Sequence, residues 1–343
     1  MRAGRWLLVA VLLAGCGAGT RPVDPSSMTA LGPTVVVTSP PGMSGGGTSA
    51  ASSVEESTVR STATSAPDPT CEWEPCYADP VAGGTLPDTV PEARGIAASS
   101  TDPDLYFVVD DGTGADGVTA VRSDGTPVGV VPVNGMSARN AEAVVAGSCP
   151  AGRCLYVGDI GGNNGRETVT VYRATEPTMP LPASVASERW DYTYPDGSWN
   201  AEAMLVTDDG GIVIITKPDG GEAPHRVYTG APGGGELALH TTFSPPEPAS
   251  PSRSLMVGNV VTDAARSAGT VLLLTYDQAV EYRAPAPDAD PADFPTWEQR
   301  PVPMPRQWQS EGVSYRAAGG CGYVVVSEKS PMSGPAIGSV PCR

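Results

Sequence analysis

The chain has 343 residues and a formal net charge of −17, with 21 Lys and Arg against 38 Asp and Glu. A surface this acidic repels phosphate backbones and anionic head groups, so we expect no nucleic-acid partner. The content of 41 Gly and 36 Pro, with only 6% aromatic residues, indicates a turn-rich chain with short apolar segments.

The first residues have the pattern of an export signal. Arg2 and Arg5 precede an apolar run at 6–14, which is too short to span a bilayer permanently. The run ends in Leu-Ala-Gly-Cys, the pattern of a lipobox, so we predict a signal peptide at 1–15 and lipidation of Cys16. A diacylglyceryl group carries two acyl chains, such as palmitate, and would anchor the protein durably to the outer face of the cell membrane. The alternative is an ordinary secretory signal with an incidental cysteine.

Residues 16–70 are predicted to be the lipidated cysteine followed by a disordered tether. Ser, Thr, Gly, Pro and Ala dominate this segment, and it carries no aromatic residue after Cys16. Such a composition buries too little apolar surface to fold.

The cysteine count supports export independently. Seven cysteines leave six once Cys16 is assigned to lipid, and six can pair in an oxidising compartment. We predict three disulfides, which are Cys71–Cys76, Cys149–Cys154 and Cys321–Cys342. The cysteine spacing is not that of a zinc site, and the two histidines lie far along the chain from every cysteine pair, so we do not expect zinc.

Residues 71–343 are predicted to form one all-β domain. A landmark of an acidic residue followed by small and apolar residues recurs five times, at intervals of about 50 to 60 residues. The landmark acids are Glu92, Glu142, Glu202, Asp263 and Glu311. Each is followed by a turn and a strongly β-prone run, such as the runs that begin at Leu105 and Thr270.

Four short strands repeated at this interval are typical of the blades of a β-propeller, so we predict five or six four-stranded blades. The last unit stops after its third strand. A segment around residues 77–90 is therefore expected to supply the missing outer strand and to close the ring. A β-sandwich would use the same strands but leaves the regular landmarks unexplained.

First strands line the central channel of a propeller, so the landmark acids should converge there. Asp110, Asp159, Lys217 and Glu328, at the ends of second strands, would join them. Hard oxygen ligands suit Ca²⁺, with neutral donors available from Asn140, Asn200 and Asn259. The predicted metal ligands are Glu92, Glu142, Glu202, Glu311, Asp159 and Asp263. The competing interpretation pairs these acids with arginines such as Arg94, Arg139 and Arg166. The glycine-rich loop at 159–165 resembles a calcium-binding turn, although a tight turn held by Asn side chains explains it as well.

Several segments resemble a group of secreted actinobacterial propeller lipoproteins. They are residues 155–177, residues 194–205 and the segment QSEGVSYRAAGGCGYVVVSE near the C-terminus. More distantly, the landmarks are similar to esterase-like-activity-of-phytase domains and to gluconolactonase-like propellers. The latter resemblance implies a channel cation held by Glu92, Glu142, Glu202 and Glu311. The single channel lysine, Lys217, departs from propeller phytases.

Two functions follow as expectations. The first is a membrane-anchored extracytoplasmic domain that binds a small molecule, a glycan or an envelope protein, with Ca²⁺ as a stabilising ion. The second is a metal-assisted hydrolase of an ester or phosphoester, in which a channel carboxylate acts as general base.

Overall fold

The computed structural model describes residues 71, 73–162, 166–218, 224–249, 259–317 and 320–343. Cys16, the signal peptide and the tether lie outside the described residues, as do positions 163–165 of the glycine-rich loop. The described part is all-β, apart from the short 3₁₀ helix η2 (Pro291–Thr296). Among the described residues, no helix is both long and apolar enough to cross a bilayer.

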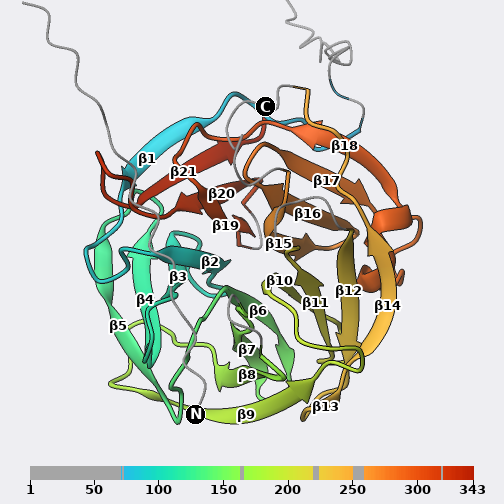
Figure 1. The fold of residues 1–343 in the computed structure, drawn as a ribbon. Helices are drawn as coiled ribbons and strands as arrows, with labels where there is room; N and C mark the ends of the chain where they lie inside the picture. The colour runs from blue at the N-terminus through green and yellow to red at the C-terminus, as the bar shows by residue number, and fades with distance from the viewer. Residues whose placement is uncertain (1–70, 72, 163–165, 219–223, 250–258, 318–319) are drawn as a thin grey trace, which may run out of the picture. The chain divides into compact units, whose positions relative to one another are not determined.

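The strands form five groups of four antiparallel strands, each ordered from the centre outward (Figure 1), and the outer strands of the first two groups are joined by a short parallel pairing of β5 with β9. Blade 1 contains β2 (Ala93–Ala98), β3 (Leu105–Asp110), β4 (Gly117–Arg122) and β5 (Pro127–Asn134). Blade 2 contains β6 (Ala143–Cys149), β7 (Gly152–Asp159), β8 (Thr168–Thr175) and β9 (Val185–Thr193). Blade 3 contains β10 (Ala201–Val206), β11 (Ile212–Thr216), β12 (His225–Gly230) and β14 (Ala238–Phe243), with the short β13 (Gly235–Glu236) pairing to β9. Blade 4 contains β15 (Val261–Ser267), β16 (Thr270–Thr275), β17 (Ala279–Arg283) and β18 (Glu298–Val302). Blade 5 contains β19 (Ser310–Tyr315), β20 (Gly322–Ser327), β21 (Ala336–Pro341) and β1 (Val81–Thr85).

The innermost strands close a ring. β2, β6, β10, β15 and β19 contact one another in that order, and β19 returns to β2. The outer strand of blade 5 comes from the start of the domain, because β1 pairs antiparallel with β21. The β-propeller class and this closure by a segment before Glu92 are therefore confirmed.

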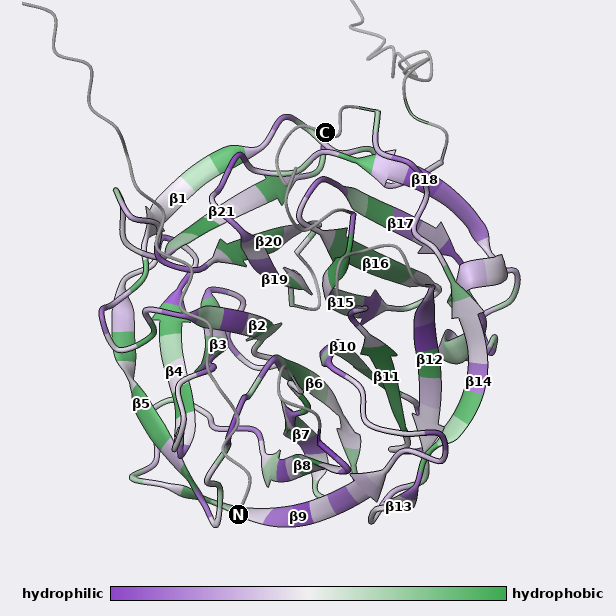
Figure 2. Cartoon of the chain, viewed as in Figure 1, coloured by the Kyte–Doolittle hydropathy of each residue, from purple (hydrophilic) through white to green (hydrophobic). Residues whose placement is uncertain are grey.

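The hydrophobic core lies between blades and not inside one layer. Five buried clusters each combine apolar residues from two neighbouring blades. One of them joins blade 5 to blade 1 and so completes the ring. The second strands, such as β11 and β16, are apolar along their length because both of their faces are covered (Figure 2). Burying one Val or Leu side chain stabilises by about 1.5–3 kcal/mol, so the five interfaces hold the ring together.

The three predicted disulfides are confirmed. The Cα–Cα distances are 5.5 Å for Cys71–Cys76, 5.9 Å for Cys149–Cys154 and 5.6 Å for Cys321–Cys342. Cys149 and Cys154 lie across the β6–β7 turn, and Cys321 and Cys342 flank the β20–β21 pair, where the strand interpretation placed them.

Candidate functional site at the carboxylate end of the channel

In four of the five blades, a shift in strand register redirects one side chain at the start of the innermost strand. The shift falls between Ala201 and Ala203 in β10 and between Ser310 and Gly312 at β19. Bulges of this kind redirect a side chain, and here the redirected residues are Glu202 and Glu311. Glu142 has the same position in blade 2, because its backbone N–H bonds to the Gly158 carbonyl, opposite the start of β6.

In blade 1 the structure differs from the predicted landmark. The register shift falls between Ala93 and Ile96, so the residue equivalent to the channel acids is Arg94 and not Glu92. Glu92 is exposed at the channel entrance, where its backbone N–H donates to the Asp110 carboxylate at 3.0 Å. The two segments share the pattern of a small residue on either side, Ala93-Arg94-Gly95 and Ser310-Glu311-Gly312, which was the available signal.

Blade 4 also differs from the expectation. The shift between Val261 and Asp263 gives Thr262 the equivalent position, and the Thr262 hydroxyl donates to the Ser310 carbonyl at 2.8 Å. Asp263 is buried and accepts the Val313 backbone N–H at 2.8 Å, so it joins blade 4 to blade 5. Burial raises the pKa of Asp263 well above its usual range.

Arg94 is the centre of the site. Its Nη1 lies 2.9 Å from Glu311 Oε1 and 2.7 Å from Glu328 Oε2, its Nη2 lies 2.8 Å from Asp111 Oδ2, and its Nε lies 3.2 Å from Glu142 Oε2. One guanidinium therefore contacts four carboxylates from three blades, and we call these five residues the Arg94 group. The alternative in which arginines pair with the landmark acids is confirmed for this residue.

A second cation holds the other side of the channel. Lys217 Nζ lies 3.2 Å from Glu202 Oε1 and bonds to the Tyr276 hydroxyl at 2.8 Å. Tyr276 in turn donates to Glu311 Oε1 at 3.0 Å. Glu311 thus links the Arg94 and Lys217 groups, and Lys217 and Glu328 join the channel acids as predicted.

Three amide side chains repeat the same contact. Each lies two residues before a channel acid and donates to it: Asn140 to Glu142 at 2.7 Å, Asn200 to Glu202 at 3.2 Å, and Gln309 to Glu311 at 3.5 Å. Asn259 does not take part, since its amide donates to the Pro246 carbonyl.

Asp159 belongs to the structural frame behind the site. Its carboxylate forms a bidentate ion pair with Arg166 at 2.7 and 3.0 Å and accepts the backbone N–H groups of Arg139 and Asn140. These bonds fix the segment that carries Glu142. Both interpretations of the loop at 159–165 depend on Asn163 and Asn164, which lie outside the described residues.

Three carboxyl groups of the site have a raised pKa. Burial, reinforced by the charge of Glu202, raises the pKa of Glu142 well above its usual range. Burial raises the pKa of Glu311 to about 8, against the opposing effects of Arg94 and Lys217. A hydrogen bond with Asp111 raises the pKa of Glu92 to about 7. Carboxyl groups that carry a proton therefore stand beside ionised ones at neutral pH.

The site opens into a cavity of about 500 Å³ at the channel entrance. It is lined by Pro91, Glu92, Trp308, Gln309, Glu328, Lys329, Ser330 and Pro331. Glu328 belongs to both the cavity wall and the Arg94 group, so a molecule in the cavity would reach the buried network directly.

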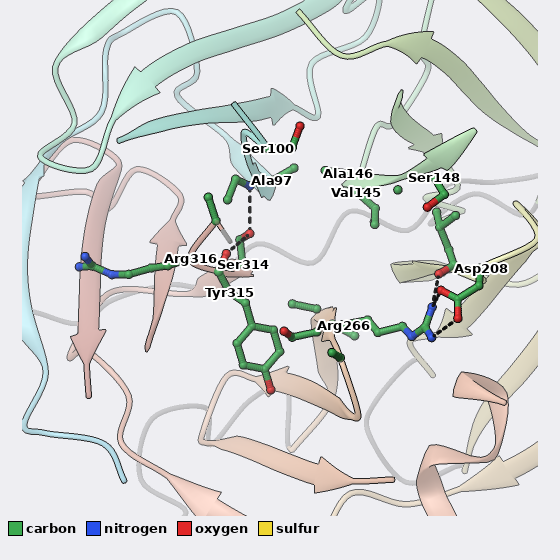
Figure 3. A pocket seen from close by; sticks show the side chains of 18 of the residues that line it. Ala97, Ser100, Val145, Ala146, Ser148, Asp208, Arg266, Ser314, Tyr315 and Arg316 are labelled. Carbon is green, nitrogen blue, oxygen red and sulfur yellow. Dashed lines mark hydrogen bonds and ion pairs between the residues drawn. The ribbon is translucent and has the colours of Figure 1, made fainter. Parts of the chain in front are cut away.

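A larger cavity of about 1090 Å³ lies at the opposite ends of the innermost strands (Figure 3). Small side chains such as Ala97, Ala146 and Ser314 surround it, and the charges of Arg266 and Asp208 satisfy each other. Because titratable groups with raised pKa gather at the other end, we place the candidate site there in spite of its smaller volume.

The predicted calcium ligands do not form a compact cage. Within the described ranges, the only group of three His, Cys, Asp or Glu residues whose ligand atoms lie within 4.8 Å of one another is Cys71, Glu74 and Cys76, and both cysteines are in a disulfide. The channel acids offer oxygen atoms suited to Ca²⁺, but Arg94 and Lys217 already contact them.

Comparisons with known proteins assign no family to this chain. No family model and no curated protein matches the chain. Among solved structures, it is similar to an alpha-L-arabinofuranosidase from Lactobacillus brevis, with 13% identity, a TM-score of 0.42, and coverage of 74% of this chain and 92% of that chain. It is also similar to a GH43_1 enzyme from Xanthomonas citri, with 12% identity, a TM-score of 0.43, and coverage of 76% and 90%. An exo-1,5-alpha-L-arabinanase from a bovine ruminal metagenomic library has 10% identity, a TM-score of 0.42, and coverage of 75% and 95%.

Proposed function

We propose that this protein is a lipid-anchored extracytoplasmic β-propeller that binds a small polar ligand at the carboxylate end of its channel. The observation that carries the proposal is the set of carboxylates around Arg94, in which Glu328 connects the three others, which are buried or half-buried, to an open cavity. Such a convergence of polar groups with shifted pKa in a concave site is the usual setting of ligand binding.

The anchor is tested at Cys16. The variant Cys16→Ser should lose metabolic labelling by palmitate and leave the membrane fraction, because no thiol remains to take the diacylglyceryl group. A Cys71→Ser, Cys76→Ser double variant is the control that keeps the lipid. Membrane attachment of the Cys16→Ser protein would refute the anchor and leave the ligand site untouched.

The ligand site is tested with a soluble chain that starts at residue 17. Its thermal unfolding is followed in a screen of small polar molecules, since a ligand bound only by the folded state raises the midpoint by mass action. Glu328→Gln should weaken any stabilisation, whereas Glu298→Gln, on the outer strand β18, should not. Equal stabilisation of both variants would place the ligand elsewhere.

Calcium is tested in the same assay after treatment with a chelator. The excess of carboxylates favours a cation, whereas Arg94 and Lys217 compete for the same oxygens. A saturable rise in the unfolding midpoint with Ca²⁺ would support a structural ion. The absence of a rise would leave the two side-chain cations as the counter-charges of the channel.

Hydrolysis is a second candidate function, and a specific observation favours it. Glu142 and Glu311 have raised pKa values and contact the same guanidinium, so one carboxyl can donate a proton while another accepts one. Turnover of chromogenic lactones, esters or phosphoesters that is lost in Glu142→Gln and in Glu202→Gln would support it. Turnover that survives both variants, or that requires no folded channel, would exclude it.

A further inference from the structure

We propose that the ligand at the channel entrance is a saccharide and that Trp308 is the platform on which its ring stacks. This inference rests on the proposed ligand site and adds the chemical class of the ligand. A sugar ring has an apolar C–H face and an edge of hydroxyl groups that both donate and accept. A suitable site therefore needs an aromatic face beside a mixed set of polar groups.

The aromatic face is present and exposed. Trp308 lines the cavity with 53% of its surface accessible. The other tryptophans among the described residues are buried or half-buried. Met332 is 96% exposed in the turn that follows Ser330 and Pro331, two other residues of the cavity wall. Large apolar side chains gathered at a polar cavity mark a binding surface, because water contact costs free energy that a ligand recovers.

The platform is coupled to the buried carboxylates through Gln309. This residue follows Trp308, donates to Glu311 and has a φ of 37°, the one left-handed value among non-glycine residues in the described ranges. Glu311 is fully buried, and its Oε2 has no hydrogen-bond partner among the residues that the structure describes. A hydroxyl group that hydrogen-bonds to Gln309 at the cavity wall would therefore be one side chain away from this buried carboxylate.

The polar edge of the cavity has the mixed character that hydroxyl groups require. Glu92 and Glu328 supply carboxylate oxygens, and Lys329 supplies a cation. Glu328 is paired with Arg94, and Lys329 lies on the same cavity wall as Glu92, so a ligand would meet hydrogen-bond acceptors and a donor together, which hydroxyl groups can use at once. The cavity volume of about 500 Å³ is in the range of small-ligand sites.

The test uses the soluble chain from residue 17 and an immobilised panel of neutral and acidic oligosaccharides. Saccharides that bind are then titrated in solution by calorimetry, whose signal does not depend on the replaced tryptophan, with choline as a cationic probe of the same aromatic face. We expect saccharide binding and no choline binding. Trp308→Ala should weaken the affinity at least tenfold and Trp308→Phe should weaken it less, because a smaller ring still stacks. Leu239→Ala, a partly exposed apolar position on the outer strand β14, is the matched control and should bind normally.

The outcomes separate this inference from the proposed function. Saccharide binding that is unchanged in Trp308→Ala overturns the stacking platform. Choline or another small polar molecule that binds with dependence on Glu328, while no saccharide does, overturns the ligand class and leaves the channel site standing. Saccharide binding that depends on neither Trp308 nor Glu328 overturns both.

Discussion

Arg94 shows how much a single residue determines in a channel of like charges. Three blades direct carboxylates toward one guanidinium, and the buried acids Glu142 and Glu311 are among its four partners. Carboxylates that contact the same guanidinium are close enough to repel one another unless a cation or a proton intervenes. Arg94 therefore acts as the internal counter-ion of the site.

We predict that Arg94→Gln lowers the free energy of unfolding by about 3–5 kcal/mol, the cost of leaving buried charges without a partner. The loss should be larger at pH 8 than at pH 5, because protonation relieves the acids. Urea denaturation at both pH values measures it. Arg189→Gln is the control, since its pair with Asp191 is about half exposed and should change stability by less than ~1 kcal/mol. A loss as small as that of the control would remove Arg94 from its central role.

Glu311 predicts a pH dependence with a defined sign. Its folded-state pKa of about 8 lies above an unfolded value of roughly 4.3, so the folded state binds more protons between these limits. Stability is then fully present below the lower value and falls as pH rises toward 8, by at most ~1.4 kcal/mol per pH unit for one proton. Glu311→Gln should show a shallower fall between pH 5 and pH 8 in the same urea experiment. An unchanged slope would show that Glu311 does not carry the proton.

At the scale of the element, the repeated pattern predicted the strands better than the register. Second strands such as β3 and β16 are continuous apolar runs, so their positions follow from the sequence. Register shifts depend on contacts between blades, which no local pattern encodes. For this reason Glu92 and Asp263 were placed at channel positions that belong to Arg94 and Thr262.

The entrance was the other part that the sequence did not reveal. The site includes three residues from loops or strand ends, which are Trp308, Gln309 and Asp111. Their positions along the chain do not indicate that they meet. The outer strand β18 was also not predicted, because the insertion that contains η2 separates it from β17. By contrast, Glu142 and Glu202 were found from the landmarks, and Lys217 from its position at the end of a second strand.

The innermost strands approach so closely that a glycine is required beside a channel residue. A Cβ on Gly312 would lie 2.3 Å from the Arg94 carbonyl oxygen of the neighbouring blade. We predict that Gly312→Ala lowers the free energy of unfolding by about 1–3 kcal/mol, because backbone of blade 1 has to move.

The matched control for that variant is Gly129→Ala. Its Cβ would meet only the end of the Leu181 side chain, at 3.0 Å, which can rotate away. Denaturant unfolding compares the two. Equal stability of both variants would contradict the close approach of β19 and β2.

At the scale of the whole molecule, the ring is closed by the two ends of the domain. β1 pairs with β21, the Arg343 backbone N–H donates to the Cys76 carbonyl, and Tyr77 bridges Cys342. Arg300 fastens the first segment by stacking on Trp73, with its guanidinium carbon 4.5 Å from the ring centroid. Cys321–Cys342 lies at this seam, whereas Cys149–Cys154 lies inside one hairpin of blade 2.

The two disulfides should therefore differ in their effect on stability. The chain-entropy relation gives about 3 kcal/mol for the 21-residue separation of Cys321–Cys342 and about 2 kcal/mol for the 5-residue separation of Cys149–Cys154. The Cys321→Ser, Cys342→Ser variant should lose more stability than this relation gives, because the disulfide holds the end of β21, the strand that pairs with β1 to close the ring. Thermal and urea unfolding of the two double-serine variants measure the difference. If the hairpin variant is the less stable of the two, the seam is not the weak point of the ring, and the interblade cores must hold blade 5 without covalent help.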